Sequence, residues 1–126
     1  MLDRFRVYAV LPASDLQRAK AWWQAKIGMS PTNEDPGGLW YACADGTWVV
    51  LTPSGYAGTA QNTAVSFSVT GIEDLMEELR RRGVAFEEYD LPNFKTENGL
   101  FEAGGYKAAW FKDSEGNIVE IAQVPS

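Results

Sequence analysis

Histidine is absent from this 126-residue chain, and cysteine occurs only once, as Cys43. Histidine is the commonest general base and the commonest protein ligand of zinc, nickel and iron, so its absence removes the usual transition-metal sites. With one cysteine and no histidine, structural zinc sites and Cys–His or Ser–His nucleophilic pairs are excluded. The chemistry that remains open is carboxylate chemistry, or binding without catalysis.

Long apolar runs and positive charge are also scarce. No stretch approaches the roughly 20 apolar residues of a membrane-spanning helix, and the first residues lack the apolar region of a signal peptide. Eleven Lys and Arg face seventeen Asp and Glu, which gives a net charge of -6. An acidic surface repels phosphate groups, so we expect neither nucleic acid nor membrane as a partner. Because the single cysteine cannot form an internal disulfide, a cytoplasmic location is expected.

The elements that the sequence does predict occur twice in the same order. Residues 6–11 alternate as a strand, a helix follows between the cap Ser14 and Gly28, and residues 39–44 and 47–52 form a hairpin. Residues 53–62 are rich in turn-forming types and break the pattern. A second strand (64–69), a helix from Thr70 to Gly83, a strand (84–89) and a closing hairpin (107–111 and 117–123) then follow.

Two segments of the second half are predicted to be irregular. Residues 91–105 read as a long loop, which would be expected to form a lid over a pocket and contains Phe94 and Phe101. Residues 113–117 (Asp-Ser-Glu-Gly-Asn) invite a catalytic or calcium-binding interpretation, but turn chemistry explains them fully.

The repeat predicts an α+β fold of two tandem βαβββ modules that form a sheet-lined cleft. A period of about sixty residues is too long for a solenoid, so the two units are expected to pair within one domain, 1–126. The first module covers about 4–54, the linker about 53–62 and the second module about 63–125. Alternation assigns one face of each strand, including Val7 and Leu11, to the core beneath the helices. The opposite face would line the cleft and comprises Tyr8, Val10, Trp48, Val50, Thr52, Ala64, Ser66, Ser68, Ile118, Glu120 and Ala122, with Trp110 expected to join them.

Three segments resemble the vicinal oxygen chelate superfamily, also called the glyoxalase/bleomycin-resistance/dioxygenase superfamily. Residues 10–16, running on to Trp22, Trp23 and Gly28, resemble its first strand and helix, and residues 67–72 resemble the start of its second module. Residues 110–121 resemble its closing hairpin, where this chain has Asp-Ser-Glu-Gly-Asn in place of the usual Asp-Pro-Asp-Gly-Asn. The likeness covers nearly the whole chain, and it implies a homodimer.

The same resemblance identifies the positions of the catalytic metal ligands. In metal-using members, His, Glu or Gln side chains come from the first and last strands of each module. Those positions here are Tyr8, Val50, Ala64 and Glu120. Only Glu120 carries a suitable side chain, and one carboxylate cannot build a site for a divalent transition metal. We therefore predict no metal and no cofactor.

Several roles stay open for the residues that line the predicted cleft. Glu120 is either a polar residue in a wet cavity, a carboxylate that recognises a cationic or hydrogen-bonding ligand, or a general base. Tyr8 either donates a hydrogen bond to Glu120 or fills the space of the metal. Trp48 and Trp110 are placed to form flat walls for a planar or cationic ligand, although tryptophan also serves cores and dimer interfaces. The predicted ligand-binding set is Tyr8, Trp48, Val50, Ala64, Ser66, Trp110 and Glu120.

Three functions follow from these alternatives. The first is a metal-free protein that binds a small aromatic or cationic molecule, as the drug-sequestering members of the superfamily do. The second is a lyase, isomerase or dioxygenase-like enzyme that uses Glu120 with Tyr8, or an unconventional metal site. The third is an interaction module that has kept the fold and lost the site. We favour binding over catalysis because the ligand set of the metal-using members is missing.

Overall fold

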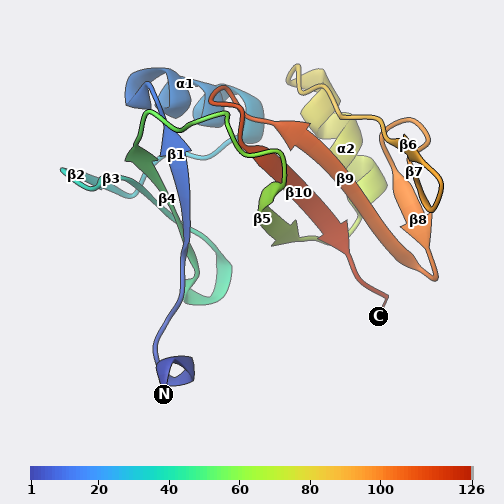
Figure 1. Cartoon of the computed structure of the whole chain (residues 1–126), viewed down its shortest axis with the longest axis horizontal. Coiled ribbons are helices and arrows are strands. Elements are labelled where there is room, and N and C mark those ends of the chain that lie inside the picture. The colour runs from blue at the N-terminus through green and yellow to red at the C-terminus, as the bar shows by residue number, and fades with distance from the viewer. Residues whose placement is uncertain (126) are drawn as a thin grey trace.

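Two four-stranded sheets, each with one helix, make up the protein (Figure 1). The structure is a computed structural model in which residues 1–125 are described. The first sheet has the strand order β1-β4-β3-β2 and carries α1 (Leu16–Ile27). Its strands are β1 (Ala9–Ala13), β2 (Asn33–Asp35), β3 (Gly38–Ala42) and β4 (Trp48–Pro53).

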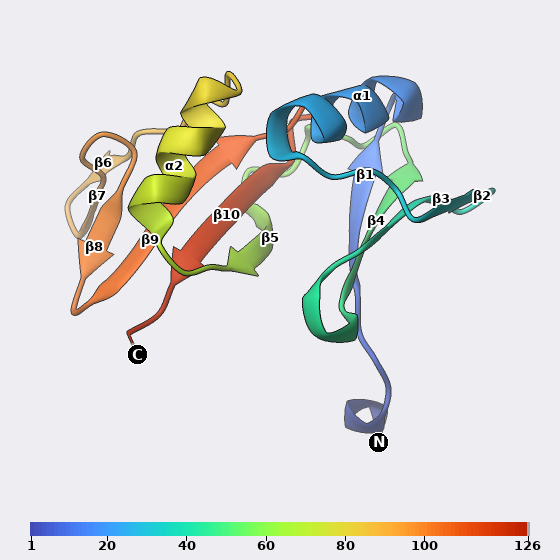
Figure 2. The same cartoon turned by 180° about the vertical axis from the view of Figure 1, so that it is seen from behind.

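The second sheet repeats this arrangement with the order β5-β10-β9-β8. Its helix α2 (Ile72–Arg81) lies across β9 and β10 when the molecule is seen from behind (Figure 2). Its strands are β5 (Thr63–Ser68), β8 (Phe101–Ala103), β9 (Tyr106–Lys112) and β10 (Ile118–Gln123), and a separate hairpin joins β6 (Asp90–Leu91) to β7 (Phe94–Lys95). In both sheets the first strand pairs parallel with the last strand, and the other neighbours are antiparallel. The predicted α+β fold of two repeated units is therefore confirmed.

The helices begin and end for local reasons. The Asp15 side chain caps α1 by accepting a hydrogen bond from the Arg18 amide, so the cap lies one residue after the predicted Ser14. Gly28 ends α1 in the left-handed conformation that glycine adopts without strain. In α2 the N-cap residue is Gly71, which has no side-chain cap, so Thr70, the predicted start of the helix, does not cap it. No helix within residues 1–125 has the length and apolar character needed to cross a membrane.

A continuous core lies between the helices and the sheets. Trp23 of α1 packs on the buried Leu11 and Leu51 of the first sheet, and Phe111 and Val119 are buried under α2. Four partly buried residues pack against both groups: Trp22, Ile27, Val65 and Phe67. The edge strands β1 and β5 lie side by side where the sheets meet, so the two sheets join edge to edge (Figure 1).

The structure differs from the sequence-based expectation in three places. Val7, predicted in the core, is 86% exposed because β1 begins only at Ala9. Residues 84–89 do not form a strand, since they pair only through the bridge between Phe86 and Phe111. Conversely, the predicted loops contain β2 in the first half and β6, β7 and β8 in the second.

Candidate functional site

A cavity of about 650 Å³ opens where the two sheets meet. We call it the junction cavity. Its volume falls in the range of roughly 300 to 1,000 Å³ that is typical of small-molecule sites. Most of its wall is apolar, with Ser66, Ser68 and the Asp45 carboxylate among the polar groups. The lining residues are Val7, Tyr8, Ala9, Cys43, Ala44, Asp45, Thr47, Trp48, Val49, Val65, Ser66, Phe67 and Ser68.

One wall of the cavity is the tight turn between β3 and β4. The Cys43 amide donates to the Thr47 carbonyl at 2.8 Å, and the Thr47 hydroxyl donates to the Ala44 carbonyl at 2.6 Å. Asp45 has a φ of 55°, a conformation that Asp tolerates better than most residues. The turn therefore holds Asp45 and Cys43 at the cavity. Burial raises the pKa of the Cys43 thiol, which keeps it in its neutral form at neutral pH.

A second turn packs between the two halves of the chain. Residues 113–117, which connect β9 to β10, pack on the start of α1, and we call them the docking turn. Glu115 accepts hydrogen bonds from the backbone amides of Ser14 and Asp15 at 2.9 and 3.0 Å. The Arg18 Nε donates to the same carboxylate at 2.9 Å. The Glu115 side chain is fully buried in this contact, which joins the two halves of the chain.

The electrostatics of Glu115 follow from these partners. Burial alone would raise the pKa of Glu115, but hydrogen bonds from Arg18, the Asp15 amide and Ser114 outweigh it and lower the pKa to about 2. Asp113 accepts from Trp23 Nε1 at 3.1 Å, and the Asn117 side-chain amide donates to the Pro12 carbonyl at 2.9 Å. The turn thus has a structural role across the junction in addition to the local turn chemistry predicted from sequence.

Glu120 lies on the face of the second sheet opposite α2. Trp110 and Ser66 are its direct neighbours in the strand register, on β9 and β5 respectively. The Tyr106 hydroxyl donates to the Glu120 carboxylate at 3.4 Å. Burial, followed by the charge and hydrogen bond of Glu120, raises the pKa of Tyr106. Tyr106, rather than the hypothesised Tyr8, is therefore the phenol that the structure places against Glu120.

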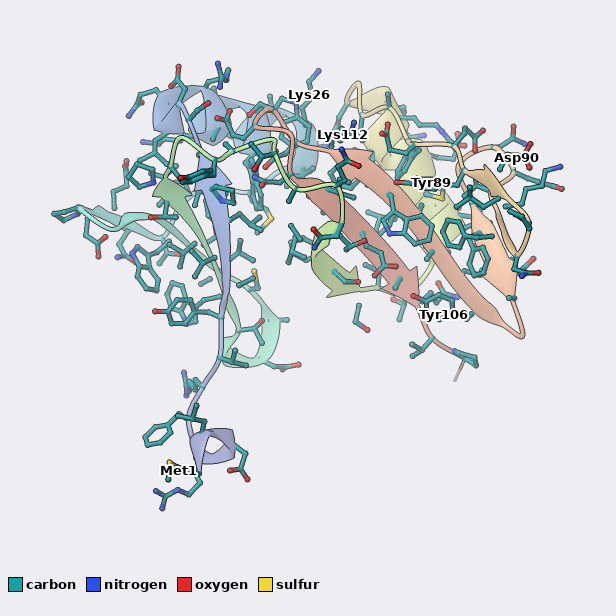
Figure 3. All side chains as sticks on the ribbon, viewed as in Figure 1. Met1, Lys26, Tyr89, Asp90, Tyr106 and Lys112 are labelled. Atoms are coloured by element: carbon teal, nitrogen blue, oxygen red, sulfur yellow. The ribbon has the colours of Figure 1, made fainter. Side chains whose placement is uncertain are left out.

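Aromatic rings cover Trp110, which is only 7% exposed. Tyr89 and Phe94 pack edge-on against its indole, with ring centroids 5.6 and 5.1 Å away. Figure 3 shows Tyr89 and Tyr106 on the same side of the second sheet. Thr96 fixes the base of the β6–β7 hairpin, because its hydroxyl accepts from the Tyr89 amide at 2.8 Å and donates to Glu88 at 2.6 Å. The predicted wall at Trp110 is thus occupied by the protein's own side chains.

The family of the chain can be stated from its sequence together with this geometry. The family model of the Glyoxalase/Bleomycin resistance protein/Dioxygenase superfamily matches residues 6–121. The chain belongs to this superfamily.

Solved structures of the superfamily fold resemble the chain along almost its whole length. UcmS2 aligns with a TM-score of 0.73 and 19% identity, covering 94% of this chain and 98% of its own. A glyoxalase/bleomycin resistance protein from Catenulispora acidiphila aligns with a TM-score of 0.68 and 19% identity, covering 96% and 99%. The fosfomycin resistance protein FosX of Listeria monocytogenes aligns with a TM-score of 0.66 and 15% identity, covering 94% and 92%. At these identities the similarity shows the fold alone. A search of curated protein sequences found no match.

The four positions at which the resemblance places metal ligands carry side chains that do not fit a divalent transition metal. Tyr8 and Val50 lie on or beside the first sheet, and Ala64 and Glu120 lie on the second. Among them only Glu120 offers a hard anionic ligand. No three His, Cys, Asp or Glu side chains gather into a potential metal site within residues 1–125. We therefore derive no catalytic step through a metal.

The structure brings together only some of the predicted ligand-binding residues. Tyr8, Trp48 and Ser66 line the junction cavity, whereas Ala64 lines a smaller hollow of about 210 Å³. Val50 and Trp110 are buried, and Glu120 is half-buried beside Ser66. In a single chain these seven residues do not all line one cavity.

Sequence reasoning missed three of the aromatic residues near these positions. Phe67 alternates with Ser66 and Ser68 in the predicted strand 64–69 and so falls on the face assigned to the core, yet it also lines the junction cavity. Trp40 packs on Tyr8 at 5.1 Å and on Trp48 at 6.2 Å. Alternation within the predicted strand 39–44 places Trp40 on the face opposite Leu39 and Tyr41, and this pattern could have assigned it to the cleft. Tyr106 lay just outside the predicted strand 107–111, so nothing local assigned its side chain to the face of Glu120.

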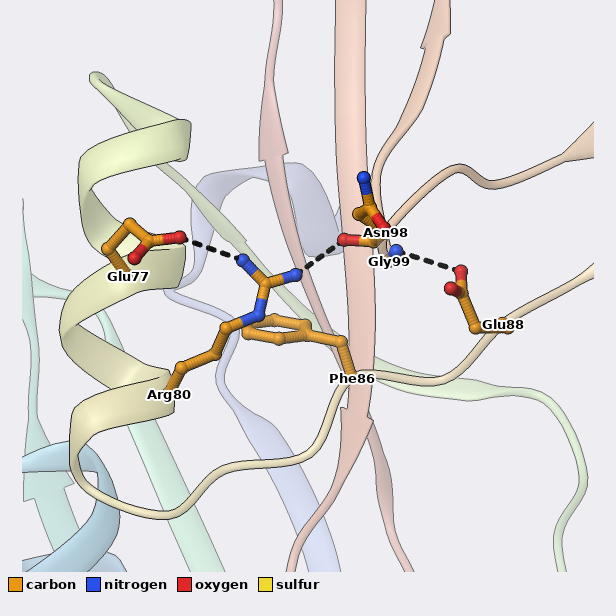
Figure 4. A pocket seen from close by; sticks show the side chains of 6 residues that line it. All are labelled: Glu77, Arg80, Phe86, Glu88, Asn98 and Gly99. Carbon is orange, nitrogen blue, oxygen red and sulfur yellow. Dashed lines mark hydrogen bonds and ion pairs between the residues drawn. The ribbon is translucent and has the colours of Figure 1, made fainter.

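A separate hollow of about 380 Å³ between α2 and residues 86–99 has a structural explanation (Figure 4). Arg80 lies 5.2 Å from the Phe86 ring centroid and donates to Glu77 and to the Asn98 carbonyl. Glu88 accepts from the Gly99 amide at 2.8 Å. These charged groups already have partners within the protein, and their hydrogen bonds hold the turn at residues 97–100. The hollow is therefore not the candidate site.

Proposed function

We propose that this superfamily member is a metal-free small-molecule-binding protein whose ligand occupies the junction cavity. The observation that carries the proposal is an apolar cavity of about 650 Å³ with Tyr8, Trp48 and Phe67 in its wall. Aromatic walls favour a planar ligand, because stacking adds to the burial of apolar surface. Tyr8, Trp48 and Ser66 belong to the ligand-binding set predicted from sequence.

The charge of the protein supports a cationic or basic ligand. Asp45 is the charged residue in the wall of the junction cavity. The net charge of -6 adds a long-range attraction for cations. We therefore propose an aromatic compound that carries one positive charge, with its ring against Trp48 and its charge toward Asp45.

Cys43 provides the test, because it is the only cysteine of the chain and lines the cavity. Its rate of reaction with a maleimide is measured with and without a planar aromatic cation such as proflavine. We expect the probe to slow labelling, and Trp48→Ala to weaken its binding by roughly tenfold, since one stacking contact is worth about 1 to 1.5 kcal/mol. Labelling should be run at mildly alkaline pH because the pKa of Cys43 is raised.

Two control variants sharpen this experiment. Tyr56→Ala removes an exposed aromatic side chain that does not line the junction cavity, and it should leave binding unchanged. Trp110→Phe tests the ligand contact predicted for Trp110, and it should matter only if ligand binding displaces Tyr89 and Phe94. Equal labelling rates with and without a panel of planar cations, up to their solubility limits, contradict the proposal.

A second candidate function is acid–base catalysis of the lyase or isomerase type. The observation that favours it is the Tyr106–Glu120 pair, in which a phenol and a carboxylate lie 3.4 Å apart. A carboxylate of this kind can accept a proton that lies next to a carbonyl group. Proton NMR would follow the conversion of candidate substrates. The enzyme would be favoured if Glu120→Gln abolishes turnover while the aromatic cation still protects Cys43 from labelling, because the variant is then folded.

We also propose that the protein is a cytoplasmic homodimer. Tyr8 and Val10 are 47% and 53% exposed on the same face of the first sheet, next to the half-buried Trp40 and Trp48. An exposed apolar face of this kind is typical of a protein interface. A second copy that covers this face would place further side chains near the junction cavity. Nucleic acid and membranes are not proposed as partners because of the acidic charge.

A further inference from the structure

We propose that the ligand of the junction cavity reaches past Phe67 into a second, apolar chamber, and that it is an aromatic cation carrying an apolar group of about six carbons. The inference rests on the proposed function and names the class of ligand. The second chamber, which we call the helix-side hollow, has a volume of about 160 Å³. Its wall includes Ile27 and Met29 at the end of α1, Leu75 and Leu79 of α2, Phe67 of β5 and Ile121 of β10.

The helix-side hollow is lined entirely by apolar residues. Leu79 and Ile121 are buried, whereas Met29 and Leu75 are only half-buried, so part of this apolar surface still meets solvent. The two helices meet beside it, where the Arg82 guanidinium lies against Gly28 (Figure 2). A cavity of about 150 Å³ with a comparable apolar lining accepts a molecule of benzene. The helix-side hollow therefore fits one ring or one short chain.

Phe67 is the residue that the two spaces share, because it lines both the junction cavity and the helix-side hollow. Its strand β5 is at the edge of the second sheet and pairs only with β10, where Phe67 lies opposite Ile121. The Phe67 side chain is half-buried and packs against both cores. Rotation about its side-chain bonds breaks no hydrogen bond of the sheet. A change of rotamer can therefore join the two spaces while the backbone stays in place.

Charge decides which part of the ligand enters which space. An unpaired charge among apolar side chains is strongly unfavourable, so the helix-side hollow takes only the apolar group. The junction cavity has the Asp45 carboxylate and the Trp48 ring in its wall. The charged ring therefore stays in the junction cavity, and the apolar group extends from it past Phe67.

Two compounds that differ only in their apolar group test the inference. N-methylquinolinium and N-hexylquinolinium carry the same charged ring, and their dissociation constants follow from the protection of Cys43 against maleimide. We expect the hexyl compound to bind at least roughly tenfold more tightly, since each buried methylene tightens binding by up to about fourfold. Dissociation constants that agree within about threefold overturn the inference.

Methionine methyl groups report where the hexyl chain lies. The chain has three methionines, and Met29 is the one that lines the helix-side hollow. Met1 is 91% exposed, and the Met76 methyl points toward Gly99 instead. In protein labelled with carbon-13 at these methyl groups, the hexyl compound should shift the Met29 resonance and leave those of Met1 and Met76 in place. The methyl compound should leave all three unchanged. A hexyl compound that protects Cys43 without shifting Met29 overturns the inference.

A variant that fills the helix-side hollow gives an independent test. Leu75→Trp places a larger side chain in its wall and should reduce the preference for the hexyl compound to less than about threefold. The matched control is Leu91→Trp, which makes the same change at a position that is 57% exposed, and it should keep the preference. Far-UV circular dichroism checks the folding of both variants. If Leu75→Trp does not fold, the Met29 shift in the wild type decides the inference.

The same measurements separate this inference from the proposed function. Equal protection of Cys43 by the two compounds, with no shift of Met29, overturns the inference and leaves the proposed function standing. A hexyl compound that shifts Met29 while neither compound protects Cys43 shows a hollow that binds apolar molecules by itself. That result overturns both the proposed function and the continuous site.

Discussion

Glu115 joins parts of the chain that lie far apart in sequence. Its carboxylate satisfies the backbone amides of Ser14 and Asp15, which lie 101 and 100 positions earlier in the chain. These amides are free at the start of α1 because the first turn of a helix lacks internal acceptors. The negative charge also complements the positive end of the helix dipole. One side chain thus caps a helix and joins the two halves of the protein.

Glu115→Gln should therefore destabilise the protein by about 3 kcal/mol, because the amide leaves the buried donors poorly paired. The measurement is the free energy of unfolding in urea at pH 7. Glu102→Gln, which also neutralises one acid but at an exposed position, is the matched control and should change little. A Glu115→Gln effect no larger than that of the control would contradict the structural role given to the docking turn.

The contacts of Glu115 should also make the stability of the protein depend on pH. The pKa of Glu115 falls from 4.5 to about 2 on folding, so the folded state holds the charged form more strongly than the unfolded state does. The resulting stabilisation is complete above about pH 4.5 and is lost as the pH falls toward about 2. Thermal unfolding between pH 5 and pH 2 should therefore show a steeper loss for the wild type than for Glu115→Gln. Parallel curves would contradict this assignment.

At the scale of elements, the sequence predicts what depends on neighbours along the chain. The helix predicted between Ser14 and Gly28 agrees with α1, because helix periodicity is a local signal. Residues 84–89 read as a strand, yet only Phe86 finds a partner, on β9. The predicted site failed for a related reason. Nothing near Trp110 in sequence shows that Tyr89 and Phe94 cover it, because those rings arrive from the separate β6–β7 hairpin.

The buried hydroxyl of Thr96 and a backbone hydrogen bond from the Thr96 amide to the Tyr89 carbonyl hold the base of that hairpin. Thr96→Val should destabilise it by about 1 kcal/mol, since the Tyr89 amide loses its acceptor while the side-chain volume is kept. Amide exchange should rise in residues 89–96, and acrylamide should quench tryptophan emission more strongly, an increase that Trp110→Phe should abolish. Thr59→Val is the matched control, because its hydroxyl bonds to the Tyr56 carbonyl on the exposed surface. Equal exchange rates in the two variants would show that Thr96 does not fix the hairpin.

At the scale of the whole molecule, the junction combines buried polar contacts with an open cavity. The docking turn closes one part of it with buried polar contacts, and the junction cavity opens another. A rigid seam beside an open cavity suits ligand binding, because the walls are held in place before the ligand arrives. The two sheets should then behave as one unit, since Trp22, Ile27, Val65 and Phe67 pack against both cores.

Cooperative unfolding tests that coupling directly. Trp110 is the only one of the five tryptophans in the second half of the chain, so the tryptophan fluorescence of Trp110→Phe comes from side chains of the first half, of which Trp22 and Trp23 also contact the second half. Far-UV circular dichroism reports on both halves. We expect the fluorescence and circular dichroism of Trp110→Phe to change over the same range of urea concentration. Unfolding of either sheet removes the shared residues and the docking turn, and this exposes the core of the other sheet.

A second substitution in the same background, Asn117→Ala, removes the hydrogen bond to the Pro12 carbonyl. It should lower the urea midpoint while the two transitions still coincide. Separated transitions in Trp110→Phe alone would mean that the two halves fold independently and that the walls of the junction cavity are not held together in advance.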